Sequence, residues 1–482
     1  MRSLALFRVA LGAAVLYDAV TRFGDLTAFL TDDGVLPRVF CFQDMHPLRL
    51  SVYMINGSAP FAAALLFLQA AAAAALLAGW RTRIAACVTW FLVISVQLRN
   101  PLVLQGGDIL LRMLAFWAMF LPLGAAYSVD RALDTSGRAA PRVALSGGTI
   151  ALLSQTLMVY LFSAALKTSP EWHRDGSAIY YALSLEQFST PLGTWLLGFP
   201  DFLVLLTHFT WWIEAAGPLL LLAPFGGGAV RVLGVFVFAA FHLAMGACLR
   251  LGTFPLFDLV SLVPFLPSSF WDSLEAALRK GKEEVRIYFD ADCGFCKKSV
   301  YLIREMFALA GAPVIPAQAD PVTHELMLRH NSWIVEAGGR RYHKFDAFVE
   351  LVRASPVFSF LAPVLRLKPV HAAGTSAYEW TASHRAKASL PLAWLRFTPA
   401  PAEPGTLAGG AAFLFLIYVF FWNWSTLPGG ERFTLPRGYE RPGKLLYLDQ
   451  KWDMFSPYPL KMDGWYVIQA KLADGSRVDF FR

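Results

Sequence analysis

The sequence predicts a polytopic α-helical membrane bundle with an inserted soluble α/β domain and a small β-rich tail. Of the 482 residues, 56% are hydrophobic and only 16% are charged, and the mean hydropathy is +0.47. This composition is too apolar for an ordinary soluble protein. Apolar segments of about 20 residues, the length that crosses a bilayer, recur along the chain. They give way near residue 284 to strand-like and amphipathic helical patterns.

Apolar segments predict the spanning helices of a first domain, residues 1–275. They lie near 3–21, 59–80, 84–98, 109–126, 147–166, 200–224, 230–249 and 254–270. Arg8 and Asp18 interrupt the first segment, which favours an uncleaved helix over a signal peptide. The segments 84–98 and 254–270 are short, so a tilted or re-entrant helix is an alternative for both.

Three further regions follow along the chain. Residues 284–395 form the expected soluble domain, and the apolar run 407–424 predicts an additional span within 405–426. Residues 430–482 predict a β-rich tail with strands joined at Asp474-Gly475.

The Lys and Arg residues of the short loops predict the orientation. They are denser in the loops that follow every second segment, which favours a cytoplasmic N-terminus. We therefore expect a multi-pass protein of the bacterial inner membrane, with the soluble domain cytoplasmic and the tail extracytoplasmic. One miscounted span would reverse both placements. The +7 net charge is spread over these loops, so lipid headgroups are favoured as partners over nucleic acid.

Two thiols stand close together in DADCGFCKKSV, where a strand-like run meets a helical one. A thiol at a helix N-terminus is stabilised as thiolate by the helix dipole, and Lys297 and Lys298 favour the thiolate too. Asp290 and Asp292 oppose it. The alternative is half of a metal site or an inert thiol pair, and no metal is predicted.

With SAYEWTASHR at 376–385, this segment resembles the DCC family of thiol-disulfide oxidoreductases. Asp290, Cys293 and Cys296 match the signature of that family. The resemblance implies a thioredoxin-like fold, with Cys293 as the attacking thiolate and Cys296 as the resolving thiol.

Lys167 ends an apolar helix just before Pro170. A lysine in this position usually extends its ammonium to the membrane interface. Alternatively, desolvation disfavours the ammonium and leaves an amine that can act as a base.

The first 270 residues resemble the HTTM family, which is related to vitamin K-dependent γ-glutamyl carboxylase. The likeness lies in residues 99–130, in FHLAMGACLRLGTFP (241–255) and in the segment that carries Lys167 and Trp172. It implies that Lys167 is the base that deprotonates a reduced quinone of the vitamin K or menaquinol type. Asn100 is followed by proline where the carboxylases have an Asn-His pair, and their large lumenal domain is missing, which argues against glutamate carboxylation.

Further ionisable groups in the predicted spans suggest a polar interior site, because charges within a membrane usually face the bundle interior. Trp172, Asn100, Arg112, Glu214 and His242 are the candidate substrate- or cofactor-binding residues. Arg112, His208 and His242 are the candidate partners of Glu214. The alternative for each is a buried structural pair that fixes helix register.

The tail segment that begins at residue 447 resembles a partner protein of sporulation-delaying toxin maturation through Gln450, Trp452 and Phe455. The alternative is a small folded cap over the extracytoplasmic loops.

The sequence thus predicts a membrane oxidoreductase of the HTTM type that carries out quinol-dependent oxidation, epoxidation or peptide modification, fused to a thiol-disulfide oxidoreductase. Its expected partners are the bilayer, a quinone and a secreted peptide, and the lysine and the thiols can lie on opposite membrane faces. Two alternatives are a membrane-anchored thiol-disulfide oxidoreductase and a non-enzymatic scaffold for peptide-toxin maturation or immunity.

Overall fold

Long apolar helices form the body of the molecule. The computed structural model describes all residues except 45, 140, 142, 400–404, 431–437, 465–466 and 480–482. Within the described residues, seven helices are long and apolar enough to cross a membrane. They are α1 (Arg2–Gly24), α4 (Ala59–Ala78), α5 (Thr82–Arg99), α8 (Gly147–Leu166), Pro200–Leu222 with α12 (Pro200–Ala216) and α13 (Pro218–Leu222), Gly226–Cys248 with α14 (Ala229–Cys248), and α23 (Thr406–Ser425). They confirm the predicted multi-pass bundle.

The predicted span 109–126 forms a helix that is too short to cross a membrane. Its helix, α6 (Gly106–Ala118), has 13 residues and is buried among the other helices. The following segment turns instead of continuing, because the buried Arg8 guanidinium donates to the carbonyls of Leu123, Ala126 and Tyr127 at 2.9, 3.1 and 2.5 Å. These contacts also supply the partners that Arg8 needs inside an apolar bundle.

The predicted span 254–270 is a bent pair of helices. The chain forms α15 (Phe254–Leu262) with a short 3₁₀ turn and then α16 (Ser268–Arg279), at 93° to each other. Pro267 stands directly before the bend and cannot continue the preceding helix. If this pair counts as one span, the described residues contain eight spans instead of the predicted nine.

Close helix contacts and paired charges hold the bundle together. Gly12 of α1 lies against α4, where a Cβ would stand 2.8 Å from the Leu77 nitrogen. Arg22 joins Asp18 of its own helix at 2.9 Å and Asp108 of α6 at 2.6 Å. These charges are thus compensated within the bundle, as apolar surroundings require.

The inserted domain has a four-stranded sheet. Strands β1 (Val285–Phe289), β2 (Val314–Pro316), β3 (Ile334–Ala337) and β4 (Arg340–His343) lie in the order β2-β1-β3-β4. Only β1 and β2 are parallel, and the other neighbours are antiparallel. Its main helices are α17 (Gly294–Met306), α18 (Pro321–His330), α19 (Lys344–Ala354) and α21 (Lys368–Ser383). This topology is that of the predicted thioredoxin-like fold.

The remaining helices are short. They are α2 (Leu26–Leu30), α3 (Arg38–Asp44), α7 (Val129–Ala132), α9 (Pro170–His173), α10 (Ala178–Ser184), α11 (Pro191–Leu196), α20 (Ala362–Leu365), α22 (Arg385–Ala388) and α24 (Glu440–Leu446). In the tail, the predicted hairpin forms from β5 (Gln469–Lys471) and β6 (Arg477–Asp479). Part of the predicted tail domain lies outside the described residues.

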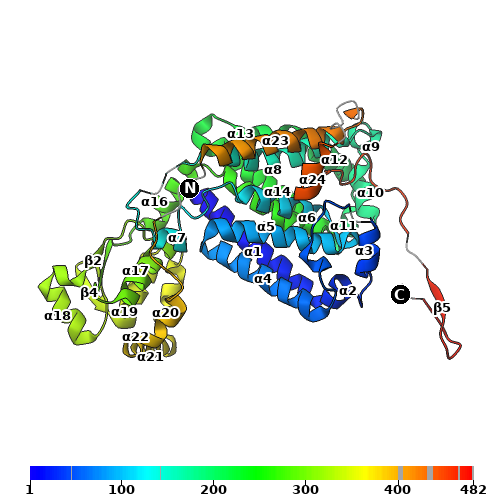
Figure 1. Cartoon of the computed structure of the whole chain (residues 1–482). Coiled ribbons are helices and arrows are strands. Elements are labelled where there is room, and N and C mark those ends of the chain that lie inside the picture. Colours follow the sequence, from blue (N-terminus) through cyan, green and yellow to red (C-terminus); the bar gives the residue numbers. More distant parts are fainter. Residues whose placement is uncertain are drawn as a thin grey trace.

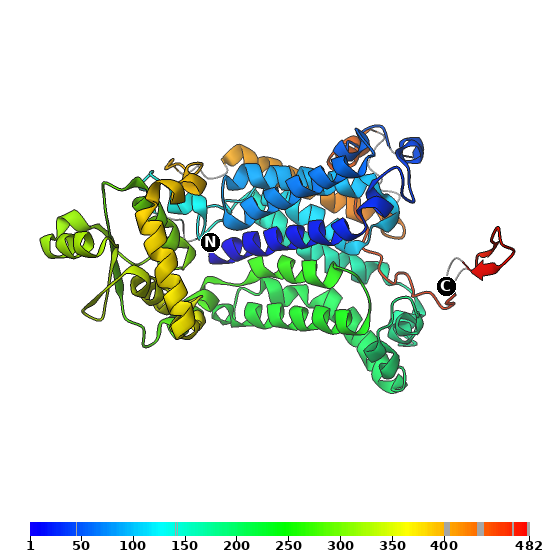
Figure 2. The same ribbon diagram turned by 90° about the horizontal axis from the view of Figure 1, so that it is seen from below.

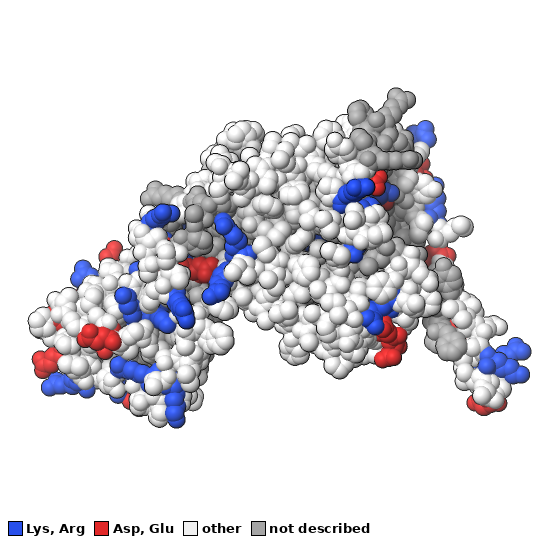
Figure 3. Space-filling view, in the orientation of Figure 1, with Lys and Arg blue, Asp and Glu red and all other residues white. Residues whose placement is uncertain are grey.

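The inserted domain and the tail hairpin lie at opposite ends of the bundle (Figure 1). The view from below shows the inserted domain beside the beginning of α1, with the spans running away from it (Figure 2). Charged side chains gather on the inserted domain and toward the other end, while the bundle surface between them is almost free of charge (Figure 3). Exposed apolar side chains on the spanning helices, such as Phe67, Leu205 and Phe236, are expected for contact with lipid.

A buried carboxylate joins the inserted domain to the bundle. Glu305 of α17 is 6% exposed and accepts the backbone N–H of Tyr127 at 2.6 Å. Burial raises the pKa of Glu305 despite this hydrogen bond and the nearby Arg131, Arg304 and Arg8. The folded chain therefore holds the proton more tightly than the unfolded chain, so this group's contribution to stability falls as pH rises through its ordinary pKa toward the raised one.

We expect Glu305→Gln to remove this pH dependence and to be no less stable than wild type near pH 7, because the amide oxygen still accepts from Tyr127. Glu305→Ala should lose about 1–3 kcal/mol, since the Tyr127 N–H then has no acceptor. Thermal unfolding in detergent between about pH 4 and 8, a range that begins near the ordinary carboxyl pKa, would measure both effects. A pH dependence that persists in Glu305→Gln would contradict this assignment.

Candidate functional site

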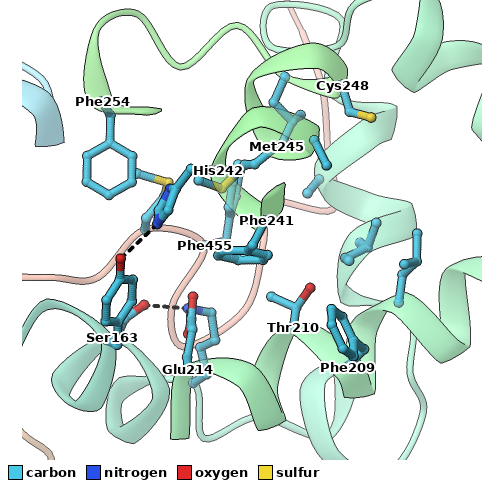
Figure 4. A pocket seen from close by; sticks show the side chains of 18 of the residues that line it. Ser163, Phe209, Thr210, Glu214, Phe241, His242, Met245, Cys248, Phe254 and Phe455 are labelled. Carbon is cyan, nitrogen blue, oxygen red and sulfur yellow. Dashed lines mark hydrogen bonds and ion pairs between the residues drawn. The ribbon is translucent and has the colours of Figure 1, made fainter. Parts of the chain in front are cut away.

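An apolar cavity of about 460 Å³ lies at the end of the bundle away from the inserted domain. Residues of α8, α12, α14 and the tail line it, and the ring side chains Phe209, Phe241, Phe254 and Phe455 point toward it (Figure 4). Its volume is in the range of small-molecule sites, and such sites combine apolar walls with a few polar groups. Lys167, Trp172, Glu214 and His242, predicted from the sequence, all line this cavity.

Lys167 is buried at the end of α8. It is 3% exposed, and its Nζ lies 2.5 Å from Ser163 Oγ and 2.7 Å from Glu214 Oε2. The Nζ also stands 5.0 Å from the centre of the Trp172 ring. The ammonium therefore finds its partners inside the protein and is not exposed to solvent.

The partner of Glu214 differs from the sequence expectation. It pairs with Lys167, and not with Arg112, His208 or His242. The reason is geometric, because α12 packs beside α8 and brings Glu214 level with the end of that helix.

A second polar cluster surrounds His242. Its Nε2 lies 2.6 Å from Asp258 Oδ2 and 3.1 Å from the Tyr160 hydroxyl, and this hydroxyl donates to Asp258 Oδ1 at 2.9 Å. Sequence reasoning missed Asp258 and Tyr160. The available signal was a lone carboxylate in the apolar run FPLFDLVSL, since an intramembrane charge needs a partner.

The tail closes one side of the cavity. Trp452, Met454 and Phe455 line it, and Trp172 Nε1 donates to the Phe455 carbonyl at 3.1 Å. Buried Gln450 accepts from Gln155 of α8 at 2.7 Å and from Trp452 Nε1 at 2.9 Å. The Gln450, Trp452 and Phe455 pattern thus packs into the bundle beside Lys167.

We expect Gln450→Ala to loosen this part of the tail, because both donors to its side-chain oxygen lose a buried acceptor. Each unsatisfied group costs about 1–3 kcal/mol. Limited proteolysis of the full chain in detergent should cleave the segment around residue 450 sooner than in wild type. Gln469→Ala, in the exposed hairpin strand β5, is the control. Unchanged proteolysis of Gln450→Ala would show that these hydrogen bonds do not hold the tail.

Asn100 and Arg112 lie outside this cavity. The Asn100 side chain accepts from Leu102 N at 3.1 Å and donates to the Phe29 carbonyl at 3.3 Å. Arg112 donates to the Tyr447 carbonyl at 3.0 Å, and its guanidinium stands 3.9 Å from the centre of the Tyr447 ring. Arg112 therefore anchors the tail to α6.

The two thiols of the inserted domain form a disulfide, Cys293–Cys296, at the start of α17. Cys293 caps this helix, and its Sγ accepts the Cys296 N–H at 3.1 Å. Both side chains are partly exposed. The helix N-terminus can stabilise a thiolate at Cys293 once the disulfide is reduced.

The thiols and Lys167 lie at opposite ends of the bundle. The inserted domain sits where α1 begins, whereas Lys167 follows the far end of α8, near α9 (Figure 1). The two centres therefore make no contact.

A bundle of spanning helices that carries a thioredoxin-like domain with a Cys-x-x-Cys pair defines a membrane protein of redox type. The HTTM domain matches residues 1–271, more than half of the chain, so the chain belongs to the HTTM domain family. The DCC1-like thiol-disulfide oxidoreductase family matches residues 287–390. No curated protein and no solved structure matches the chain. The two families are those that the sequence motifs predicted, while the tail resemblance stays a prediction.

Proposed function

We propose that the HTTM domain oxidises a reduced quinone, with Lys167 as the base, and that the DCC1-like domain exchanges thiols and disulfides at the other end of the bundle. The observation that carries the proposal is a buried lysine paired with Glu214 inside an apolar cavity of a membrane protein. Apolar walls with a few polar groups suit a lipid-soluble ring that carries hydroxyl groups.

The residues of the cavity fit a reduced quinone. Its aromatic walls suit a flat apolar ring, and Lys167 with Glu214 can meet a hydroxyl group. The His242 Nδ1 is buried and lacks a hydrogen-bond partner among the described residues, so a second polar group of a ligand can be satisfied there. The same apolar surroundings strengthen each electrostatic interaction in the site.

The proposed proton transfer uses Lys167 and Glu214 together. Moving the ammonium proton of Lys167 to the Glu214 carboxylate, 2.7 Å away, leaves a neutral amine that can accept a hydroxyl proton. The quinol supplies two electrons when bound, and dioxygen is the proposed oxidant. The products are then quinone with hydrogen peroxide, or quinone epoxide with water, and both reactions balance.

We further propose that the inserted domain is cytoplasmic and that the Lys167 cavity with the tail is extracytoplasmic. Arg2, at the start of α1, pairs with Glu275 of α16 at 2.9 Å, which supports a common side for the N-terminus and the inserted domain. An epitope at the C-terminus should then be accessible to antibody in intact spheroplasts. Accessibility only after lysis would reverse the orientation.

The experiment for the function measures oxygen consumption by membranes with 2-methyl-1,4-naphthohydroquinone, after subtraction of the uncatalysed rate. Lys167→Met should lose about 10²–10⁴-fold, the usual contribution of a general base. Lys280→Met, at the exposed end of α16, is the matched control. If Lys167→Met keeps the wild-type rate, the bundle is an anchor or a scaffold and the quinol proposal fails.

A further inference from the structure

The second polar cluster of the cavity has an arrangement suited to proton transfer. His242, Asp258 and Tyr160 are 1%, 0% and 2% exposed and come from α14, α15 and α8. The Asp258 carboxylate receives hydrogen bonds from Tyr160 at 2.9 Å and from Ser261 at 2.8 Å, and it lies 2.6 Å from His242 Nε2. This carboxylate is therefore well placed to hold the imidazole and to compensate a positive charge on it.

The contacts of Nε2 determine what the other ring nitrogen can do. Because the Tyr160 hydroxyl gives its hydrogen to Asp258 Oδ1, its 3.1 Å hydrogen bond with Nε2 requires the hydrogen on Nε2, and the neutral ring keeps its lone pair at Nδ1. Nδ1 is buried and has no hydrogen-bond partner in the described part of the chain. His242 lines the cavity, and Nδ1 is the ring nitrogen left to accept a proton from a ligand bound there.

His242 lies away from Lys167, at the level of an earlier part of α8. Tyr160, which contacts His242, precedes Lys167 by two helical turns, or about 10 Å of helix rise. Among the residues lining the cavity, Lys167, Glu214 and His242 are the charged or basic ones. The cavity thus has two separate basic groups with apolar walls between them.

We propose that His242, positioned by Asp258, is a second proton acceptor and that the ligand is an aromatic ring with two hydroxyl groups, one facing Lys167 and one facing His242. This inference rests on the proposed function. One O–H bond breaks toward the Lys167 amine and the other toward His242 Nδ1. The resulting imidazolium is compensated by Asp258, which acts as a positioning residue.

The test measures ionisation of a bound ligand without turnover. Full-length protein in detergent binds 2-methyl-1,4-naphthohydroquinone under anaerobic conditions at pH 7, and the ultraviolet spectrum reports ionised hydroxyl groups. We expect His242→Gln to lose about half of the ionised-hydroxyl signal, Lys167→Met to lose the other half, and the double variant to lose all of it. Asp258→Asn should reduce only the part of the ionised-hydroxyl signal that depends on His242.

The controls separate this inference from the proposed function. His208→Gln, on α12 and outside the cavity lining, should keep the full signal. If His242→Gln matches wild type while Lys167→Met loses the signal, the second acceptor is refuted and the proposed function survives. If only Lys167→Met matches wild type, the base assignment fails instead. If His242→Gln keeps its wild-type thermal unfolding but does not bind the ligand, His242 is a binding residue and the inference is overturned.

Discussion

Cys293→Ser is expected to reduce thiol-disulfide exchange by the full chain to the uncatalysed rate. The thiolate is the nucleophile in this reaction, and serine cannot replace it. Cys293 caps α17, where the helix dipole favours its thiolate, whereas Cys296 lies one turn further along that helix. Cys296→Ser should therefore still attack a disulfide substrate, but it should accumulate as a mixed disulfide through Cys293.

Reduction of a small aromatic disulfide by the dithiothreitol-recycled protein would measure the exchange rate, and mass spectrometry would detect the mixed disulfide. Cys87→Ser, at an exposed cysteine of α5, is the control and should keep the wild-type rate. If Cys293→Ser forms the mixed disulfide and Cys296→Ser does not, the two thiols have the opposite roles.

The distance between the two centres has a measurable consequence. Because Cys293 and Lys167 lie at opposite ends of the bundle, they share no contact through which one substitution would change the other site. Quinol oxidation should thus be unchanged in Cys293→Ser, and thiol exchange should be unchanged in Lys167→Met.

Local patterns were sufficient to predict several features. The Cys-x-x-Cys pair is a local motif at a strand-to-helix junction, so its place at the start of α17 followed from spacing alone. Apolar length predicted most spans, because a bilayer sets that length. It failed for 109–126, where contacts from the distant Arg8 turn the chain.

The partners within the cavity could not be predicted, because they are far apart along the chain. Glu214 is 47 residues from Lys167, and no periodicity links the two. Gln450 meets Gln155 across 295 residues. A buried charge indicates that a partner exists, but only helix packing determines which one. For this reason the sequence does not reveal that Arg112 and Asn100 lie outside the cavity.

The buried pair of Lys167 and Glu214 should give the largest change in stability. Their side chains are 3% and 10% exposed, so Lys167→Met leaves a carboxylate buried without its counter-charge. Breaking such a pair from one side costs about 3–5 kcal/mol, while replacing both partners can be almost neutral. We therefore expect Lys167→Met to unfold at a clearly lower temperature in detergent at pH 7, and Lys167→Met/Glu214→Leu to recover most of the loss.

The matched control is Lys344→Met, which breaks the exposed pair with Glu379 in the inserted domain. This pair should contribute only about 0–1 kcal/mol, because solvent screens it. If Lys167→Met is as stable as this control, the Glu214 carboxyl is already protonated and the Lys167 amine is already neutral in the resting protein. The amine would then be a free base before any ligand binds, and proton transfer from Lys167 to Glu214 would no longer be a required step.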